Sequence, residues 1–231
     1  MRWKFLLLVM LLSLLPVRAQ EGLNLPTELY VLFNEGRIDR YGLGTAGVRQ
    51  VTDADAFVLD FRVAPDGNWL AYRTLDGLFL RDMFTENSTR QLEDTRASVP
   101  LIRGEGETIA WTNNSDALAY TTEYGGRVYF FDSNTFADLT TAGLRDLRWS
   151  PDGAFLAAEA EGGVWWIFQR SGTEMALRAA IPGANGGDWR TSRQFIFAPV
   201  EGGLSMLDLT SGNLQIPVQD AFQNYYLPTG L

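Results

Sequence analysis

The chain contains no cysteine and no histidine, and its only lysine is Lys4. Without imidazole or thiol groups, a Ser-His-Asp or Cys-His triad is excluded, and so is a zinc or iron site with histidine ligands. Disulfides cannot contribute to stability, so the fold must be held by its packed core. Carboxylate chemistry remains available, but no D-x-[DN]-x-[DN]-G calcium loop occurs. We therefore expect no cofactor and no bound metal.

The long apolar run lies at the N-terminus, at residues 5–15. Two basic residues precede it, and a Val-Arg-Ala site follows and ends at Ala19. This pattern predicts a secretory signal peptide over residues 1–19. A membrane anchor is the alternative, but the run is far shorter than the roughly 20 residues needed to span a bilayer. We expect residues 20–231 to form a single domain outside the cytoplasm, secreted or periplasmic and not embedded in the membrane.

Positive charge is scarce in the predicted mature chain. Removal of residues 1–19 leaves 16 arginines against 28 aspartates and glutamates, a net charge near −12. Such a surface repels phosphate backbones and anionic lipid. We therefore expect no nucleic-acid partner.

A motif recurs four times, at intervals of 48, 38 and 40 residues. The aligned positions are Val63, Trp111, Trp149 and Trp189. Each is followed by an apolar run, a glycine-bearing turn, a second apolar run and a weaker fourth one. Short β-rich runs bounded by turn residues predict antiparallel strands. The runs after the motif are 69–72, 117–120, 155–158 and 195–198, and the next ones are 78–82, 128–132, 164–168 and 204–208.

Repeated four-stranded units of about 40 residues are typical of β-propeller blades. One such sheet cannot bury both of its faces alone, whereas neighbouring blades can bury them for one another. The pairs Trp165-Trp166 and Phe130-Phe131 put aromatic rings on both faces of a strand. We expect these rings to pack between blades.

The two ends of the chain suggest the number of blades. Residues 26–52 supply the second, third and fourth strands of a blade without a first strand. Residues 222–231 match the beginning of a repeat, with Tyr226 at the Trp149 position. We therefore expect an all-β propeller of five four-stranded antiparallel blades, closed by a C-terminal strand that completes the N-terminal blade. A fragment of a larger propeller with six or more blades is the alternative.

The motif resembles the TolB-like propeller repeat, which is related in style to WD repeats. Its hallmark is an apolar residue or Trp, then Ser-Pro-Asp-Gly, then an apolar strand containing Ala. Residues 147–158 match it fully and residues 61–72 match with two substitutions. Residues 109–120 and 187–198 keep the Trp and lose Pro-Asp-Gly. The resemblance implies a protein-binding platform in the cell envelope, or an accessory domain beside a hydrolase.

Arginines and tryptophans gather on the strand before each turn, which we expect to line the central channel. Arg and Trp are enriched at protein-binding hot spots. We therefore predict a non-catalytic, monomeric scaffold that binds a protein or peptide. Alternatively, the arginines pair with nearby acids and the tryptophans pack between blades. The candidate binding residues are Arg62, Arg148, Arg190, Trp111, Trp149 and Trp189.

A second hypothesis is a carbohydrate-active, glycosidase-like propeller. Such an enzyme needs two carboxylates roughly 5–10 Å apart across a pocket. The acids on the same predicted inner strands are Asp60, Asp146 and Asp188. Other recurring acids fit turn-capping roles. These are Asp66 and Asp152 in Pro-Asp-Gly, and Asp82, Asp132 and Asp208 after the third strands.

Overall fold

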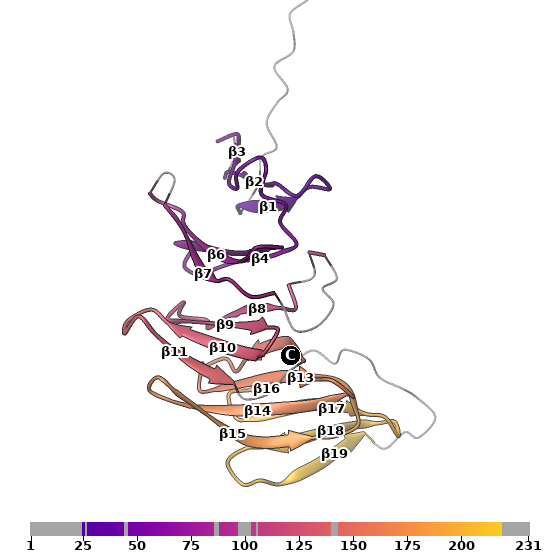
Figure 1. The fold of residues 1–231 in the computed structure, drawn as a ribbon. Coiled ribbons are helices and arrows are strands. Elements are labelled where there is room, and N and C mark those ends of the chain that lie inside the picture. The colour runs from indigo at the N-terminus through magenta and orange to yellow at the C-terminus, as the bar shows by residue number, and fades with distance from the viewer. Residues whose placement is uncertain are drawn as a thin grey trace, which may run out of the picture. The chain divides into compact units, whose positions relative to one another are not determined.

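The computed structural model describes residues 25, 27–43, 46–85, 88–96, 103–104, 106–139 and 143–218. Within these ranges every regular element is a β-strand, and the strands form five antiparallel sheets (Figure 1). The all-β class predicted from the sequence is confirmed. The chain divides into two compact units, Met1–Ala56 and Phe57–Leu231, which are described separately.

The N-terminal unit contains one sheet of three strands in consecutive order. These strands are β1 (Leu29–Leu32), β2 (Ile38–Tyr41) and β3 (Val48–Gln50). This sheet is the predicted incomplete blade, with three strands within the described residues. The strand expected to complete it, within residues 222–231, lies outside the described residues.

The C-terminal unit contains four sheets of four strands each, which we name blades A to D. Blade A comprises β4 (Asp60–Val63), β5 (Trp69–Thr74), β6 (Gly77–Asp82) and β7 (Thr89–Glu93). Blade B comprises β8 (Ile109–Trp111), β9 (Ala117–Thr122), β10 (Gly125–Phe130) and β11 (Thr135–Leu139). Blade C comprises β12 (Leu144–Trp149), β13 (Phe155–Ala160), β14 (Val164–Ser171) and β15 (Glu174–Ile181). Blade D comprises β16 (Ala184–Thr191), β17 (Gln194–Pro199), β18 (Leu204–Asp208) and β19 (Leu214–Val218).

The first strand of each blade lies at the inner edge of its sheet. Within each sheet the strands follow one another in chain order. Strand β4 contacts β8, β8 contacts β12, and β12 contacts β16. The motif residues therefore lie on neighbouring inner strands, as the repeat predicts.

The turn after the inner strand has one backbone geometry in blades A, B and C. Gly67, Ser115 and Gly153 each donate their backbone N–H to the carbonyl three residues earlier, at 2.8, 2.9 and 2.8 Å respectively. Their φ angles are 75°, 61° and 69° in the same order. Ser115 thus adopts the left-handed conformation that glycine favours. Blade B keeps the turn although its sequence has lost Pro-Asp-Gly.

Most of the recurring aspartates cap turns, as predicted. Asp66 and Asp152 each accept the backbone N–H two residues later, at 2.9 and 3.1 Å. Asp82 accepts the N–H of Phe84 at 2.8 Å, and Asp208 accepts that of Thr210 at 2.9 Å. These carboxylates accept hydrogen bonds from backbone N–H groups in the turns where the chain reverses direction.

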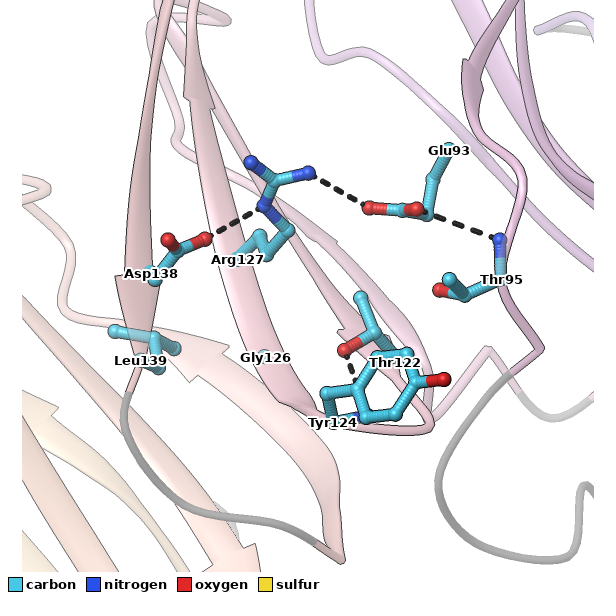
Figure 2. A pocket seen from close by; sticks show the side chains of 8 residues that line it. All are labelled: Glu93, Thr95, Thr122, Tyr124, Gly126, Arg127, Asp138 and Leu139. Carbon is cyan, nitrogen blue, oxygen red and sulfur yellow. Dashed lines mark hydrogen bonds and ion pairs between the residues drawn. The ribbon is translucent and has the colours of Figure 1, made fainter.

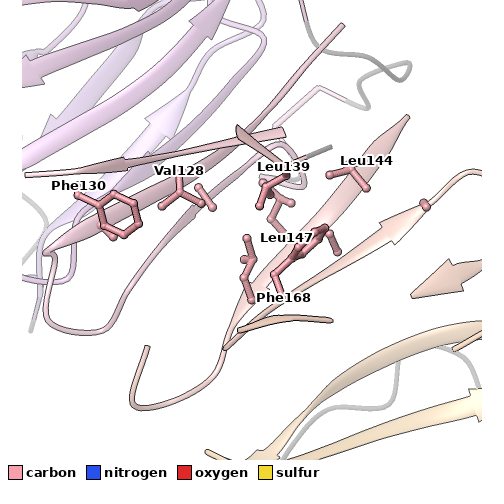
Figure 3. Close-up of a cluster of buried hydrophobic side chains, with 11 residues drawn as sticks. Val128, Phe130, Leu139, Leu144, Leu147 and Phe168 are labelled. Atoms are coloured by element: carbon pink, nitrogen blue, oxygen red, sulfur yellow. The ribbon is translucent and has the colours of Figure 1, made fainter. Parts of the chain in front are cut away.

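The core consists of apolar clusters between successive blades. The cluster between blades B and C is drawn in Figure 3, with Phe130, Leu147 and Phe168 among its members. Trp165 is fully buried between blades C and D, while its neighbour Trp166 packs against the cluster on the opposite face. The prediction that adjacent aromatic rings pack on both faces of a strand is confirmed.

Candidate functional site

Each motif tryptophan bonds to the main chain of the preceding blade. Its indole N–H donates to the carbonyl of the residue just before the motif position in that blade. The pairs are Trp111 with Arg62 at 3.1 Å, Trp149 with Ala110 at 3.2 Å, and Trp189 with Arg148 at 2.9 Å. Trp111 and Trp189 are only 9% and 6% exposed. These bonds hold neighbouring blades in register, which the sequence pattern alone did not show.

The acceptor residues and their equivalent in blade D form a row along the inner strands. We call Arg62, Ala110, Arg148 and Asp188 the inner row. Arg62 is exposed and its Nε donates to the Gly106 carbonyl at 3.3 Å. A depression of about 240 Å³ lies beside the row in blades A to C. Its lining is Arg62, Val63, Ile109, Ala110, Trp111, Leu147 and Trp149. The structure thus brings three of the six candidate binding residues to one concave surface.

Arg148 lies between two of the candidate catalytic acids. Its Nε and Nη2 donate to the two oxygens of Asp146 at 2.8 and 2.9 Å, and its Nη1 lies 3.6 Å from Asp188 Oδ1. Burial lowers and the two carboxylates raise the pKa of Arg148, and the carboxylates prevail, so its pKa lies above the ordinary value. Asp146 has φ of 48° beside an irregularity in the β12–β13 pairing, an unusual conformation for a residue with a side chain.

Asp60 occupies a different and fully buried position. Its Oδ1 accepts the N–H groups of Gly106 at 2.7 Å and Phe61 at 3.0 Å. Its Oδ2 accepts the hydroxyl of Thr108 at 2.8 Å and its N–H at 3.3 Å. Burial raises the pKa of Asp60 despite these bonds. The carboxylate joins blade A to the start of blade B and presents no surface to a substrate.

Arg190 lies over its own sheet. It is exposed, and its Nη1 is 3.5 Å from the sulfur of Met206 on β18. Arg190 thus contacts a methionine of its own blade, whereas Arg148 pairs with the carboxylates of Asp146 and Asp188. The three candidate arginines therefore have three different environments.

The structure also shows a groove that the sequence reasoning missed. It has a volume of about 440 Å³ and lies between the end of β7 and the hairpin formed by β10 and β11 (Figure 2). Arg127 bridges it, with Nη1 2.9 Å from Glu93 Oε2 and Nε 2.7 Å from Asp138 Oδ1. The groove is lined by Glu93, Thr95, Thr122, Tyr124, Gly126, Arg127, Asp138 and Leu139. The pairing of Arg127 with Asp138 could have been predicted from the register of the β10–β11 hairpin. The pairing of Arg127 with Glu93 could not, because Glu93 belongs to blade A.

Among the described residues, in the ranges given above, no three Asp or Glu side chains come together as a metal ion would require. No helix in these ranges is long and apolar enough to cross a membrane.

The fold was compared with known proteins. No family model matches the chain, and no curated protein matches it. Among solved structures, it is similar to the Myceliophteria thermophila Cps50 (Swd1) beta-propeller domain, with 14% identity and a TM-score of 0.56 over 85% of this chain and 70% of that one. A chain of the Mitotic Checkpoint Complex gives 16% identity and 0.60 over 85% and 64%. The C-terminal WD40 domain of Sif2 gives 13% and 0.58 over 83% and 55%.

These similarities define the class of fold. The chain is built as a β-propeller of the WD-repeat kind, with four-stranded antiparallel blades. The chain spans between 55% and 70% of the length of these structures. At such low sequence identity the similarity establishes architecture and does not transfer a partner or an activity.

Proposed function

We propose that this protein is a non-catalytic propeller that binds a protein or peptide on its inner row. The observation that carries the proposal is the depression beside Arg62, whose walls include Trp111 and Trp149. We further propose that the repeats are of the TolB-like type and that the protein acts as a monomer outside the cytoplasm, secreted or periplasmic.

The arrangement supports recognition because assembly and surface use different atoms. The tryptophans hold the blades through main-chain carbonyls, and Arg62 is an exposed residue whose Nε donates to the Gly106 carbonyl. Guanidinium groups bind carboxylates in a bidentate manner, and concave surfaces with Arg and Trp are typical of binding hot spots. The partner chemistry that fits best is an acidic loop or a C-terminal carboxylate.

The acids of the inner strands favour a scaffold over a glycosidase. Asp60 is sealed by its hydrogen bonds, and Asp146 and Asp188 share the guanidinium of Arg148. A glycosidase pair must instead face a substrate, with one carboxyl group able to donate a proton. No such pair is formed by these three residues.

Photo-cross-linking tests the binding surface. We would replace Ala110, an inner-row residue that lines the depression beside Arg62, with p-benzoylphenylalanine and, as a control, replace Leu177, which is 50% exposed on strand β15. Irradiation of the expressing cells and their culture medium should give a discrete adduct from position 110 and none from position 177. Adducts from position 177 alone would refute the inner row as the binding surface.

A matched pair of charge variants then measures the contribution of Arg62. In the protein without the cross-linker, Arg62→Ala should recover about tenfold less of the partner that cross-linking identified, as expected for a hot-spot arginine. Arg178→Ala removes another exposed arginine, on β15, which like Arg62 donates one hydrogen bond to a main-chain carbonyl at 3.3 Å, and it should change nothing. Equal effects of the two variants would contradict the proposal.

Location is tested on the protein itself. The expressed chain should be recovered from the periplasm or the medium, and its first residue should be Gln20. Recovery in the cytoplasm with residues 1–19 still attached would refute secretion and leave the binding proposal standing.

A further inference from the structure

We propose a second binding site, in the groove between blades A and B, that takes an arginine side chain from an extended segment of a partner protein. The site lies on β7, β10 and β11, whereas the inner row lies on the first strand of each blade. The two proposals therefore rest on different residues and can fail separately.

The groove is acidic. Glu93 and Asp138 line it with a single guanidinium, that of Arg127, between them. Two further carboxylates, Asp94 and Glu123, lie within electrostatic reach of the Tyr124 hydroxyl. Four acids thus surround one lining cation, and the field favours a positively charged ligand.

Other cations nearby do not reverse this balance. Arg73 lies beneath the groove, is 1% exposed, and interacts with Asp60 as well as Glu93. Arg96 follows Thr95 by one residue and, like Asp94 and Glu123, does not line the groove. Counting Arg73, Arg96 and Arg127 against the four acids still leaves a net charge of −1.

Asp138 is the acid that remains available. Glu93 is 6% exposed at its side chain, with one oxygen held by Arg127 and the other by the N–H groups of Asp94 and Thr95. Asp138 is 74% exposed, and Arg127 contacts only its Oδ1. Its second oxygen can accept from an incoming guanidinium.

One hydroxyl in the lining of the groove lacks a partner. Oγ1 of Thr95 is buried and has no hydrogen-bond partner in the part of the chain that the structure describes. The Tyr120 hydroxyl also lacks one, but Tyr120 is 0% exposed and does not line the groove.

The unpartnered buried hydroxyl of Thr95 points to a donor-rich ligand. Buried polar atoms nearly always have a hydrogen-bond partner, which is a protein group, a water or a ligand. A guanidinium brings five N–H donors in a fixed plane and no acceptor, so Thr95 Oγ1 and Asp138 Oδ2 can both accept from it. Lysine offers a single compact charge and would satisfy fewer of these atoms.

Tyr124 completes the site at its mouth. Its ring is 76% exposed at the turn between β9 and β10, next to Thr122 (Figure 2). Its N–H donates to Thr122 Oγ1 at 3.2 Å, which fixes the backbone of the turn. An exposed tyrosine face attracts a guanidinium through a cation–π contact.

An NMR titration of the full chain tests the proposal. The probe is N-acetyl-arginine methylamide, and the control is N-acetyl-citrulline methylamide, which has nearly the same shape and no charge. Arginine should produce saturable shifts in the amide signals of Thr122, Gly126 and Arg127, and citrulline should bind at least about tenfold more weakly. Equal binding of the two compounds, or shifts confined to other parts of the chain, would overturn the proposal.

Variants locate the effect within the groove. Asp138→Asn and Tyr124→Ala should each weaken arginine binding about tenfold. Thr95→Val should weaken it while leaving the spectrum of the folded protein intact. Asp132→Asn removes an exposed acid at the opposite end of the same hairpin and should have no effect. Unchanged affinity in the Asp138 variant would refute the site.

The occupant is checked by light scattering at the titration concentration. A monomer at this concentration is consistent with a partner segment as the natural ligand. Self-association that Asp138→Asn or the arginine probe abolishes would show that a second copy of this chain fills the groove, and the proposal would be wrong.

Discussion

The junction between blades A and B differs in chemistry from the junction between blades C and D. The second is held by aromatic rings, with Phe195 edge-on to Trp189 at a centroid distance of 5.2 Å and tilted against Trp165 at 5.3 Å. The first adds to its apolar cluster a buried aspartate and a buried arginine, Asp60 and Arg73. Of the five buried side-chain atoms without a partner among the described residues, three belong to the A–B junction (in Arg73, Thr95 and Tyr120), one to the B–C face of β9 (in Thr121) and one to C–D (in Trp165).

The difference shows how one repeat can serve two purposes. Both junctions are held by the same bond from a motif tryptophan to a main-chain carbonyl. With register fixed in this way, the remaining contacts can either maximise apolar burial or retain polar groups. Burying polar groups is costly unless they are satisfied, so the polar junction is the one where a ligand would be expected.

Truncation of Phe195 should have the largest effect. This ring is fully buried and contacts both Trp165 and Trp189. Phe195→Ala should lower the free energy of unfolding by about 4 kcal/mol, the cost of a large buried cavity. Phe136→Ala, at a ring that is 41% exposed, is the control and should cost much less in urea unfolding. Similar costs would show that the C–D junction does not depend on the packing of this buried ring.

Replacement of Asp60 should have a smaller but pH-dependent effect. Asp60→Asn removes one of the two buried carboxylates whose charge acts on Arg73 and places an amide donor against the Thr108 N–H, for a loss of about 3 kcal/mol near neutral pH. Because burial raises the pKa of Asp60, the unfolded chain releases this proton first as pH rises. Its contribution to stability therefore falls from about pH 4 up to the folded pKa and then levels off.

Urea unfolding as a function of pH measures this contribution. The variant should lack this fall with pH, whereas Asp132→Asn should retain it. An Asp60→Asn variant that follows the wild-type pH profile would contradict the assignment of the buried charge.

The tryptophan bond should cost the same at both junctions. Trp111→Phe and Trp189→Phe each remove one indole N–H and leave a carbonyl unpaired, so each should lower the free energy of unfolding by about 1 kcal/mol beyond the loss of ring area. Thermal unfolding of the two variants gives the comparison. A difference greater than about 2 kcal/mol would mean that the bond is not a shared device.

The smallest effect is expected at Ser115. Ser115→Gly removes the strain of a left-handed residue but also loses the hydroxyl that accepts the N–H of Asp66 at 3.1 Å. These changes oppose each other, and the free energy of unfolding should shift by less than about 0.5 kcal/mol. Ser115→Ala keeps the strain, loses the bond and should cost about 1 kcal/mol. Differential scanning calorimetry would separate the two, and an equal loss would exclude the strain.

The sequence predicted the strands well because their signals are local. The run 204–208 is strand β18 to the residue, and the run 78–82 is β6 less one residue. Alternating apolar residues and glycine turns define such strands within a few positions. The run 128–132 was placed two to three residues too late, since β10 already begins at the glycine pair Gly125–Gly126.

The contacts between blades could not be read from the sequence. Asp60 bonds to residues 46 and 48 positions later, and Glu93 pairs with Arg127 across 34 positions. Nothing in the pattern around either residue specifies these partners. The tryptophans were predicted to bind or to pack, and the structure adds a hydrogen bond whose acceptor is invisible in sequence because every residue has a carbonyl.

That acceptor has a consequence for how such a protein can change. Since the tryptophan bonds to a main-chain oxygen, this bond does not depend on the side chain at the inner-row position, and the row already carries Arg62, Ala110, Arg148 and Asp188 at equivalent sites. Binding specificity can therefore be changed one blade at a time, by evolution or by design, while the tryptophan hydrogen bonds between blades are kept.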